Sequence, residues 1–175
     1  YVKDPDPKLY SWVATLDLTS LYPSIIMSFN LSPEKAHKKA FYNLSDIEKL
    51  INMTEDLSWV YDSDVAMLAN GATFKRDSRG ILPELVNGMF LSRKKFKNQA
   101  IEVAKEMENQ ERETDKTSDY FKENMETLKS KYATLNCKQT AFKIALNSLY
   151  GATANSFFRY NSRDISEGIT MTGQL

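Results

Sequence analysis

The sequence predicts an α+β fold that is mostly helical, with a long antiparallel helical hairpin beside short strands and helices. Two observations support this prediction. Apolar residues recur at steps of three and four along 83–150, which is typical of long amphipathic helices. Before them, β-branched and aromatic segments are separated by turn residues, which is typical of short strands. We therefore divide the chain into 1–82, the hairpin 83–150 and a closing segment 151–175.

The composition is that of an ordinary globular domain. The chain has 175 residues, of which 42% are hydrophobic and 26% charged, which is enough apolar material for a core. It contains no apolar run of membrane-spanning length and no signal-peptide pattern, so we expect no membrane partner. Cys137 is the single cysteine, which rules out an intrachain disulfide and favours a reducing compartment.

The first part of the chain is expected to begin with a strand and a short helix. The segment "SWVATLDL", residues 11–18, is rich in β-branched and aromatic residues and predicts a strand. A helix is expected to open at Tyr22, Pro23 and Ser24, because proline is tolerated in a first helical turn.

Two further elements are expected before the hairpin. In "NLSDIEKLINM", residues 43–53, Ser45 and Glu48 have the spacing of a capping box, which predicts a helix. Turn residues at 70–71 and 78–80 bracket "ATFKR", which predicts a strand in a β-hairpin.

Two amphipathic stretches form the predicted helical hairpin. Their regularly spaced apolar residues are Val86, Met89, Phe96, Ala100, Val103 and Met107 in the first, and Phe121, Met125, Leu128, Tyr132, Leu135, Phe142, Leu146 and Leu149 in the second. A short polar connection near 114–119 favours antiparallel neighbours. Tyr150 and Gly151 end the apolar pattern, and glycine commonly closes a helix, so we expect the second helix to stop there.

Charge is segregated along the chain although the formal net charge is zero. Seven bases lie within 75–97, nine acids within 102–126, and six bases without any acid within 127–163. Such runs are usually solvated helix faces. In an antiparallel hairpin, however, the acids gather near the tip and the two basic stretches lie side by side toward the base, which leaves an anion site as the alternative.

Polar residues share helix faces near that base. Arg93 and Lys97 are four residues apart, and Lys143, Asn147 and Tyr150 follow at steps of four and three. A polar stripe beside a core stripe can be plain solvent exposure. If the two stripes converge, an arginine fork and lysine charges suit a polyphosphate.

An aromatic cluster follows the hairpin at Phe157, Phe158, Arg159 and Tyr160. Core packing is the usual role of such a cluster. Stacking on nucleic-acid bases is the alternative.

One acid stands at the end of the predicted first strand. In "LDLTSLYPSII", Asp17 precedes a turn-like stretch with Thr19 and Ser20. This is either a strand that ends in a helix cap or a metal-binding carboxylate beside a phosphate-binding turn. His37, the single histidine, has no partner for nucleophilic or zinc chemistry, and we expect it to be exposed.

Two segments resemble the signatures of a known family. "DLTSLYPSII" and "KIALNSLYG" are similar to the first two polymerase signatures of the family B DNA polymerases. Between them, "NGATFKRDSRGILPELVNGMFLSRKKFK" resembles the segment that opens the fingers of these enzymes. The resemblance covers essentially the whole chain and is strongest to the replicative polymerases of T-even-type bacteriophages, where "VKDPDP", "NLSPE" and "FFRY" have similar counterparts.

The resemblance implies a partial palm before and after the hairpin, and fingers in the hairpin itself. Asp17 would bind two Mg²⁺ ions, with the backbone carbonyl of Leu18 as a further ligand. The N–H groups of Ser20, Leu21 and Tyr22 would face the nucleotide phosphates. Tyr22 would also exclude a 2′-hydroxyl by steric clash.

In the fingers, the family's triphosphate ligands match Arg93, Lys97, Lys143 and Asn147. Lys143 would also be catalytic, together with Asp17, because it is placed to stabilise and protonate the pyrophosphate leaving group. Tyr150 and Gly151 would lie under the nascent base pair. The resemblance further implies that the hairpin closes over a bound nucleotide as a lid.

The second half of the family's metal site has no match in this chain. Two-metal phosphoryl transfer needs more than one carboxylate, and the family supplies it from an Asp-Thr-Asp segment. No Asp-x-Asp follows Gly151, and we expect Asp164 to be a helix-start or surface acid. The pairs at 4/6 and 62/64 lie in polar stretches. We therefore expect a palm-and-fingers fragment or one subunit of a split enzyme, inactive alone.

The function implied by the resemblance is that of a DNA-directed DNA polymerase in phage DNA replication, in the cytoplasm of an infected bacterial host. Its partners would be primer–template DNA, deoxynucleotide triphosphates, the remainder of the polymerase and, through that remainder, a sliding clamp. The alternative is a non-catalytic helical-hairpin interaction module whose polymerase-like residues are relics. Binding of a deoxynucleotide triphosphate with Mg²⁺ separates the two hypotheses.

Overall fold

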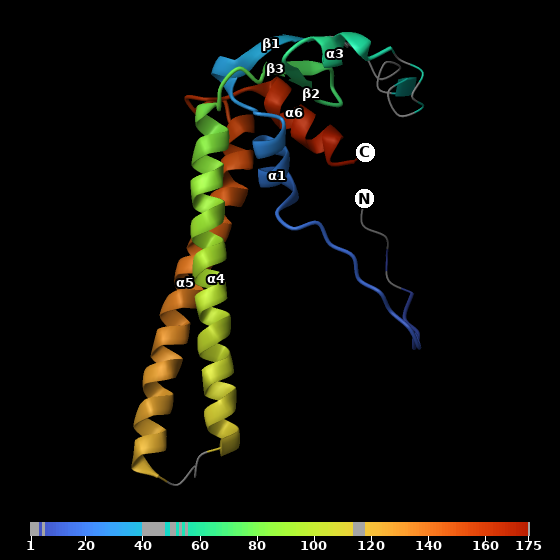
Figure 1. The fold of residues 1–175 in the computed structure, drawn as a ribbon. Helices are drawn as coiled ribbons and strands as arrows, with labels where there is room; N and C mark the ends of the chain where they lie inside the picture. Colours follow the sequence, from blue (N-terminus) through green and yellow to red (C-terminus); the bar gives the residue numbers. More distant parts are fainter. Residues whose placement is uncertain are drawn as a thin grey trace.

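Two long helices dominate the chain, and the smaller elements gather at one end of them (Figure 1). The computed structural model describes residues 4, 6–39, 48–49, 52, 54, 56–113 and 118–174. In chain order the elements are α1 Leu21–Ser28, the 3-10 helix η1 Pro33–Lys35, β1 Ala36–Lys39, α3 Ser58–Asp62, β2 Val65–Met67, β3 Ala72–Lys75, α4 Ile81–Glu113, α5 Asp119–Ala154 and α6 Arg163–Thr172.

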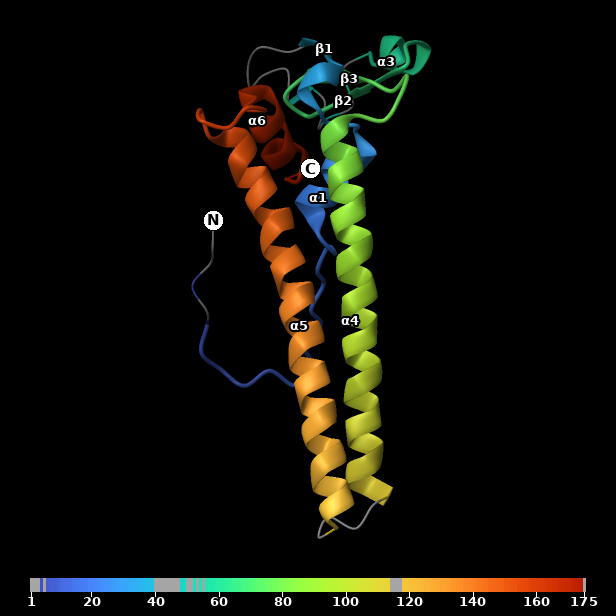
Figure 2. The same cartoon turned by 90° about the vertical axis from the view of Figure 1, so that its left-hand side faces the viewer.

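The predicted helical hairpin is confirmed. Helices α4 and α5 run antiparallel and lie side by side in both views (Figures 1 and 2). The rings of Phe96 and Phe142 stack between them, with centroids 5.9 Å apart and planes at 16°. Val86 and Leu146 are buried from the predicted apolar stripes. Of the predicted tip near 114–119, residues 114–117 lie outside the described part of the chain, and Asp119 begins α5.

The small sheet has the strand order β1-β3-β2, and both pairings are antiparallel. The predicted β-hairpin is confirmed, because β2 and β3 flank a turn at Asn70 and Gly71. Gly71 adopts a left-handed φ of 79°, which glycine reaches at little cost. The Asn70 side chain fixes the turn by accepting from Ala72 N (3.2 Å) and donating to the Asp164 carbonyl (2.9 Å).

The predicted strand at 11–18 is wrong. These residues form neither strand nor helix, and side chains such as Trp12 and Leu16 are 94% and 96% exposed. A strand exists only when another strand satisfies its backbone hydrogen bonds. Within the described residues, β3 already pairs on both edges and no strand pairs with 11–18, so strand propensity alone does not produce a ladder.

The two other local predictions before the hairpin have different outcomes. The helix that opens at Tyr22, Pro23 and Ser24 is confirmed as α1. The helix expected at 43–53 lies mostly outside the described residues; within it, Glu48 and Lys49 are helical.

Helix α5 continues through Gly151 to Ala154, so the predicted end at Tyr150 and Gly151 is wrong. A glycine inside a helix costs only about 1 kcal/mol relative to alanine. The helix ends where tertiary contacts capture its last carbonyls. The carbonyl of buried Thr153 accepts hydrogen bonds from Asn161 Nδ2 and from Ser162 N, each at 3.0 Å.

The core lies where α1, the sheet, α6 and the base of the hairpin meet (Figure 1). Its fully buried side chains include Ile26 from α1, Phe74 from β3, Leu146 from α5 and Ile169 from α6. This core fixes α1 against both hairpin helices. Among the described residues, no helix is long and apolar enough to cross a membrane.

Candidate active site

The turn at Thr19 and Ser20 leads directly into α1 and exposes backbone donors. Ser20 has φ 53° and ψ 50°, a left-handed conformation that a residue other than glycine rarely adopts. The Ser20 carbonyl accepts from Ser24 N at 2.9 Å, which begins the helix. Within the described residues, the N–H groups of Ser20, Leu21 and Tyr22 make no hydrogen bond. Unpaired N–H groups at a helix start can bind an anion.

Arg93 of α4 reaches this turn across the interface. Its Nη1 donates a hydrogen bond to Ser20 Oγ at 2.9 Å. The Arg93 side chain is half-buried, and its Nε is buried without a hydrogen-bond partner in the described part of the chain. A hollow of about 320 Å³ adjoins it and is lined by Thr19, Phe90, Arg93, Lys94, Lys97, Asn98 and Ile101. The turn and the basic stripe of α4 therefore share one hollow.

Lys143 and Asn147 lie on the same face of the hairpin as Lys97. The stacked pair Phe96 and Phe142 gives a common reference, and each residue advances about 100° around a helix. When two antiparallel helices are compared, residues the same number of positions after two facing side chains point to the same face of the hairpin. Lys97 and Lys143 each follow their ring by one residue, and both are exposed.

That face is also the one that α1 covers near the base of the hairpin. Tyr150 of α5 packs its ring on the ring of Tyr22 from α1, with centroids 4.5 Å apart and planes at 37°. The structure thus brings the predicted residues of both segments together: the Ser20 turn contacts Arg93, and Tyr22 contacts Tyr150.

The chain resembles known polymerases in sequence. A family model for DNA polymerase family B matches residues 1–117. The chain belongs to DNA polymerase family B. It is 30% identical over 204 residues to the DNA-directed DNA polymerase of Escherichia phage RB69, and 29% identical over 205 residues to that of Enterobacteria phage T4. A "DNA polymerase 1" of Pyrococcus abyssi is 27% identical over 174 residues.

These alignments cover all or nearly all of this family B chain but a small part of each relative. Both phage alignments include 100% of the chain and 22% of the relative, and the Pyrococcus alignment includes 99% and 17%. The family B polymerase structure from Pyrobaculum calidifontis superposes with a TM-score of 0.53 at 18% identity, over 87% of this chain and 15% of that one. That likeness supports the fold, and the phage relatives confirm the resemblance to phage polymerases.

The residues that family membership suggests as metal ligands, Asp17 and Leu18, supply few oxygen donors. Asp17 and Leu18 are exposed and lie two or three residues before Ser20. A carboxylate and a backbone carbonyl are the oxygen donors that Mg²⁺ prefers. Among the described residues, however, no group of three or more Asp, Glu, His or Cys side chains is close enough to hold a metal ion. Asp17 and the Leu18 carbonyl are therefore two oxygen donors close to the Ser20 turn in sequence.

Three other acids and the histidine are exposed. Asp164 lies exposed in the first turn of α6 and pairs with Lys39 at 2.8 Å, as expected of a helix-start acid. His37 is exposed in β1, which agrees with its predicted exposure. Asp62 and Asp64 are exposed at the end of α3 and just before β2.

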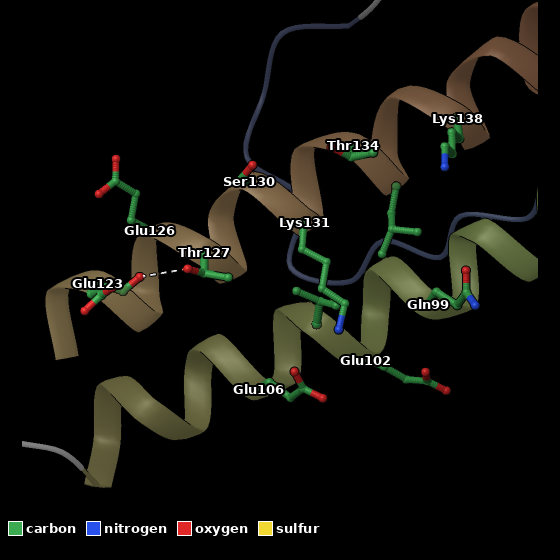
Figure 3. Close-up of a pocket in the computed structure, with 12 residues that line it drawn as sticks. Gln99, Glu102, Glu106, Glu123, Glu126, Thr127, Ser130, Lys131, Thr134 and Lys138 are labelled. Atoms are coloured by element: carbon green, nitrogen blue, oxygen red, sulfur yellow. Dashed lines mark hydrogen bonds between the residues drawn. The ribbon is translucent and has the colours of Figure 1, made fainter. Parts of the chain in front are cut away.

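A second hollow of the family B hairpin lies away from the candidate active site. It measures about 910 Å³ and lies between α4 and α5 on the tip side of Phe96 and Phe142 (Figure 3). Counted from these rings, its lining residues fall on the face opposite Lys97 and Lys143. The charged side chains that line it are Glu102, Glu106, Glu123, Glu126, Lys131 and Lys138 (Figure 3). Its four carboxylates outnumber its two lysine side chains, so this hollow suits a nucleotide triphosphate less well than the basic hollow beside Arg93.

The aromatic cluster after the hairpin divides into two parts. Phe158 packs against the core, as the simpler hypothesis predicts. Phe157 is 97% exposed, and its neighbour Arg159 lies over the Tyr160 ring at 5.7 Å from the centroid. The exposed Phe157 ring has the accessibility that the stacking hypothesis requires.

Sequence reasoning missed Thr170 of α6. Its Oγ1 lies 2.7 Å from the Tyr150 hydroxyl and donates to the Ser166 carbonyl at 3.1 Å. A hydroxyl carries one proton, so Tyr150 is the donor in the first bond. The only sequence pattern that could have pointed to Thr170 is its four-residue spacing from Ser166, and such spacing is common on any helix.

Gly151 lies on an exposed part of α5. A Cβ built at this glycine would meet nothing within 4 Å. Packing within the chain therefore does not require a glycine at this position, whereas close approach of a ligand would.

Proposed function

We propose that this chain supplies the nucleotide-binding part of a DNA-directed DNA polymerase, which adds deoxynucleotides to a primer 3′-hydroxyl opposite a template. The observation that carries the proposal is the hydrogen bond between Arg93 and Ser20. It places a guanidinium beside the N–H groups of Ser20, Leu21 and Tyr22, which make no hydrogen bond among the described residues. Positive charge and converging N–H donors on one hollow suit the phosphates of a nucleotide.

Each residue on this face has a role that its chemistry supports. The N–H groups of Ser20, Leu21 and Tyr22 would bind phosphate oxygens, as Arg93 and Lys97 would from α4. Lys143 would stabilise the pyrophosphate leaving group and donate a proton to it. Asn147 lies one turn beyond Lys143 and would add a neutral hydrogen bond.

The rings of Tyr22 and Tyr150 would contact the sugar and the base pair. The Tyr22 ring, supported by Tyr150, would leave no room for a 2′-hydroxyl and so select deoxynucleotides. Tyr150 and Gly151 would form the floor beneath the nascent base pair. The exposed ring of Phe157 would stack on an unpaired base of the DNA.

Asp17 and the Leu18 carbonyl would hold Mg²⁺, which neutralises phosphate charge and activates the primer hydroxyl when it is bound. One carboxylate rarely suffices to hold two ions, so we propose that a further acid comes from elsewhere in the polymerase. We therefore propose that this chain alone binds nucleotide but does not extend a primer. Efficient primer extension by the chain alone would contradict that statement.

Nucleotide binding by the chain tests the proposal directly. Titration of the chain with dTTP in Mg²⁺ should show binding, and Arg93→Ala and Lys143→Ala should each weaken it by about tenfold or more, because each removes charge-assisted hydrogen bonds. Lys105→Ala is the charge-matched control, since Lys105 is exposed on α4 away from this face. If neither site variant weakens binding, the non-catalytic interaction module becomes the better hypothesis.

A further inference from the structure

We propose that the Ser20 side chain is a positioning residue for Arg93. Its hydroxyl holds the guanidinium beside the phosphate-binding turn before a nucleotide binds. The Arg93 guanidinium is then already oriented toward the triphosphate. The role of Ser20 in nucleotide binding rests on the proposed function, whereas its restraint of the Arg93 side chain does not.

The hydrogen bond leaves Arg93 free to bind a phosphate at the same time. A guanidinium has five N–H donors, and the bond from Nη1 to Ser20 Oγ uses one of them. The buried Nε lacks a partner among the described residues. Because a hydroxyl is neutral, it fixes the side chain without cancelling the positive charge, as a carboxylate would. Ser20 therefore restrains Arg93 and does not compete with phosphate for its charge.

The backbone of Ser20 indicates that its hydroxyl has a use. At φ 53° the residue is in the left-handed region, where glycine fits without steric cost and a side chain does not. Backbone outliers of this kind concentrate at functional sites. A glycine here would relax the turn but could not accept the bond from Arg93. Serine nevertheless occupies this left-handed position. Its hydroxyl accepts a hydrogen bond from Arg93, which lies 73 positions further along the chain.

The restraint lowers the cost of ordering Arg93 when a triphosphate binds. A long, unrestrained arginine loses rotamer freedom on binding, and this loss weakens affinity. Since Ser20 also offers its own N–H group to the same phosphates, one residue couples α4 to the turn through its side chain and its main chain.

The first test needs no nucleotide. In the ligand-free chain, the Nε–H proton of Arg93 should exchange slowly with water and give a sharp side-chain NMR signal. Ser20→Ala and Ser20→Gly should both accelerate its exchange by about the 3- to 10-fold expected of one lost hydrogen bond. Ser28→Ala, a matched change at an exposed residue of α1, should leave it unchanged. Unchanged exchange in both Ser20 variants overturns the proposed restraint.

The second test measures affinity for dTTP in Mg²⁺. Ser20→Ala and Ser20→Gly should each weaken binding about 3- to 10-fold in the wild-type background. In an Arg93→Ala background the same changes should have no further effect, because Ser20 acts through Arg93. Equal losses in both backgrounds overturn the proposal, as does full affinity in Ser20→Gly, which would assign the effect to the backbone.

The two tests separate this inference from the proposed function. Accelerated exchange together with no dTTP binding by the wild-type chain overturns the proposed function, and with it the role of Ser20 toward a nucleotide. Tight dTTP binding that both Ser20 variants retain overturns the positioning role and leaves the proposed function standing.

Discussion

The rings of Tyr22 and Tyr150 lie with their centroids 4.5 Å apart, which joins the first signature segment to the end of the second. These tyrosines are 128 positions apart in the sequence. Tyr150 is held in turn by Thr170 through its hydroxyl. The aromatic contact therefore has support from three helices, α1, α5 and α6, and its rigidity can be tested by removing one hydroxyl at a time.

Thr170→Val should free the Tyr150 hydroxyl at little change in side-chain volume. We expect a loss of about 0.5–1.5 kcal/mol in the free energy of unfolding, because one hydrogen bond disappears. Chemical denaturation measures this loss. Tyr150→Phe removes the other partner, so the double variant should lose no more than the larger single loss. Strictly additive losses would show that the two hydroxyls do not act as a pair.

Gly151→Ala should stabilise the chain and impair the proposed polymerase. The glycine is helical and an added Cβ meets nothing within 4 Å, so alanine should raise the free energy of unfolding by up to about 1 kcal/mol. If Gly151 lies under the nascent base pair, the same methyl group should slow primer extension by a polymerase that carries this segment. Gly88→Ala on α4, where a Cβ also meets nothing, is the matched control. Unimpaired extension by the Gly151 variant would remove this residue from the proposed DNA contact.

The Glu34 carboxyl should make the free energy of unfolding depend on pH in the acidic range. Burial acts to raise the pKa of the Glu34 carboxyl, but hydrogen bonds from Ser32 Oγ (2.6 Å) and Ile81 N–H (2.7 Å) outweigh it and lower the pKa below 4.5. A lowered folded-state pKa stabilises the fold above the unfolded value of 4.5, and this stability disappears as pH falls through the folded pKa.

Glu34→Gln tests this dependence, because glutamine does not titrate. Denaturation from pH 6 down to about pH 3 should show a shallower fall in the free energy of unfolding for the variant than for the wild type. The carboxylate receives the first N–H of α4, so the base of the hairpin is the region that loosens. Parallel curves for the two proteins would contradict this assignment.

Much of the fold followed from local pattern. Apolar spacing predicted both long helices because a helix repeats its faces every three or four residues regardless of distant contacts. Asn70 and Gly71 predicted the β-hairpin because glycine accepts the left-handed turn. The same logic failed at 11–18 and at Gly151. A strand requires a partner, and a helix end is set here by contacts to Thr153 from residues further along the chain.

The features of the candidate site also separate into those that the sequence predicts and those that only helix packing produces. The sequence by itself determined the family B signatures, the basic stripes and the acid before the turn, since these depend on residue type and spacing. Only the tertiary structure decided that Arg93 contacts Ser20, that the Tyr22 ring packs on Tyr150 and that Thr170 accepts a hydrogen bond from Tyr150. These pairs are separated by long stretches of chain, and packing of α1 and α6 against the hairpin brings them together. No periodicity encodes such contacts, because they arise from how the helices pack on one core.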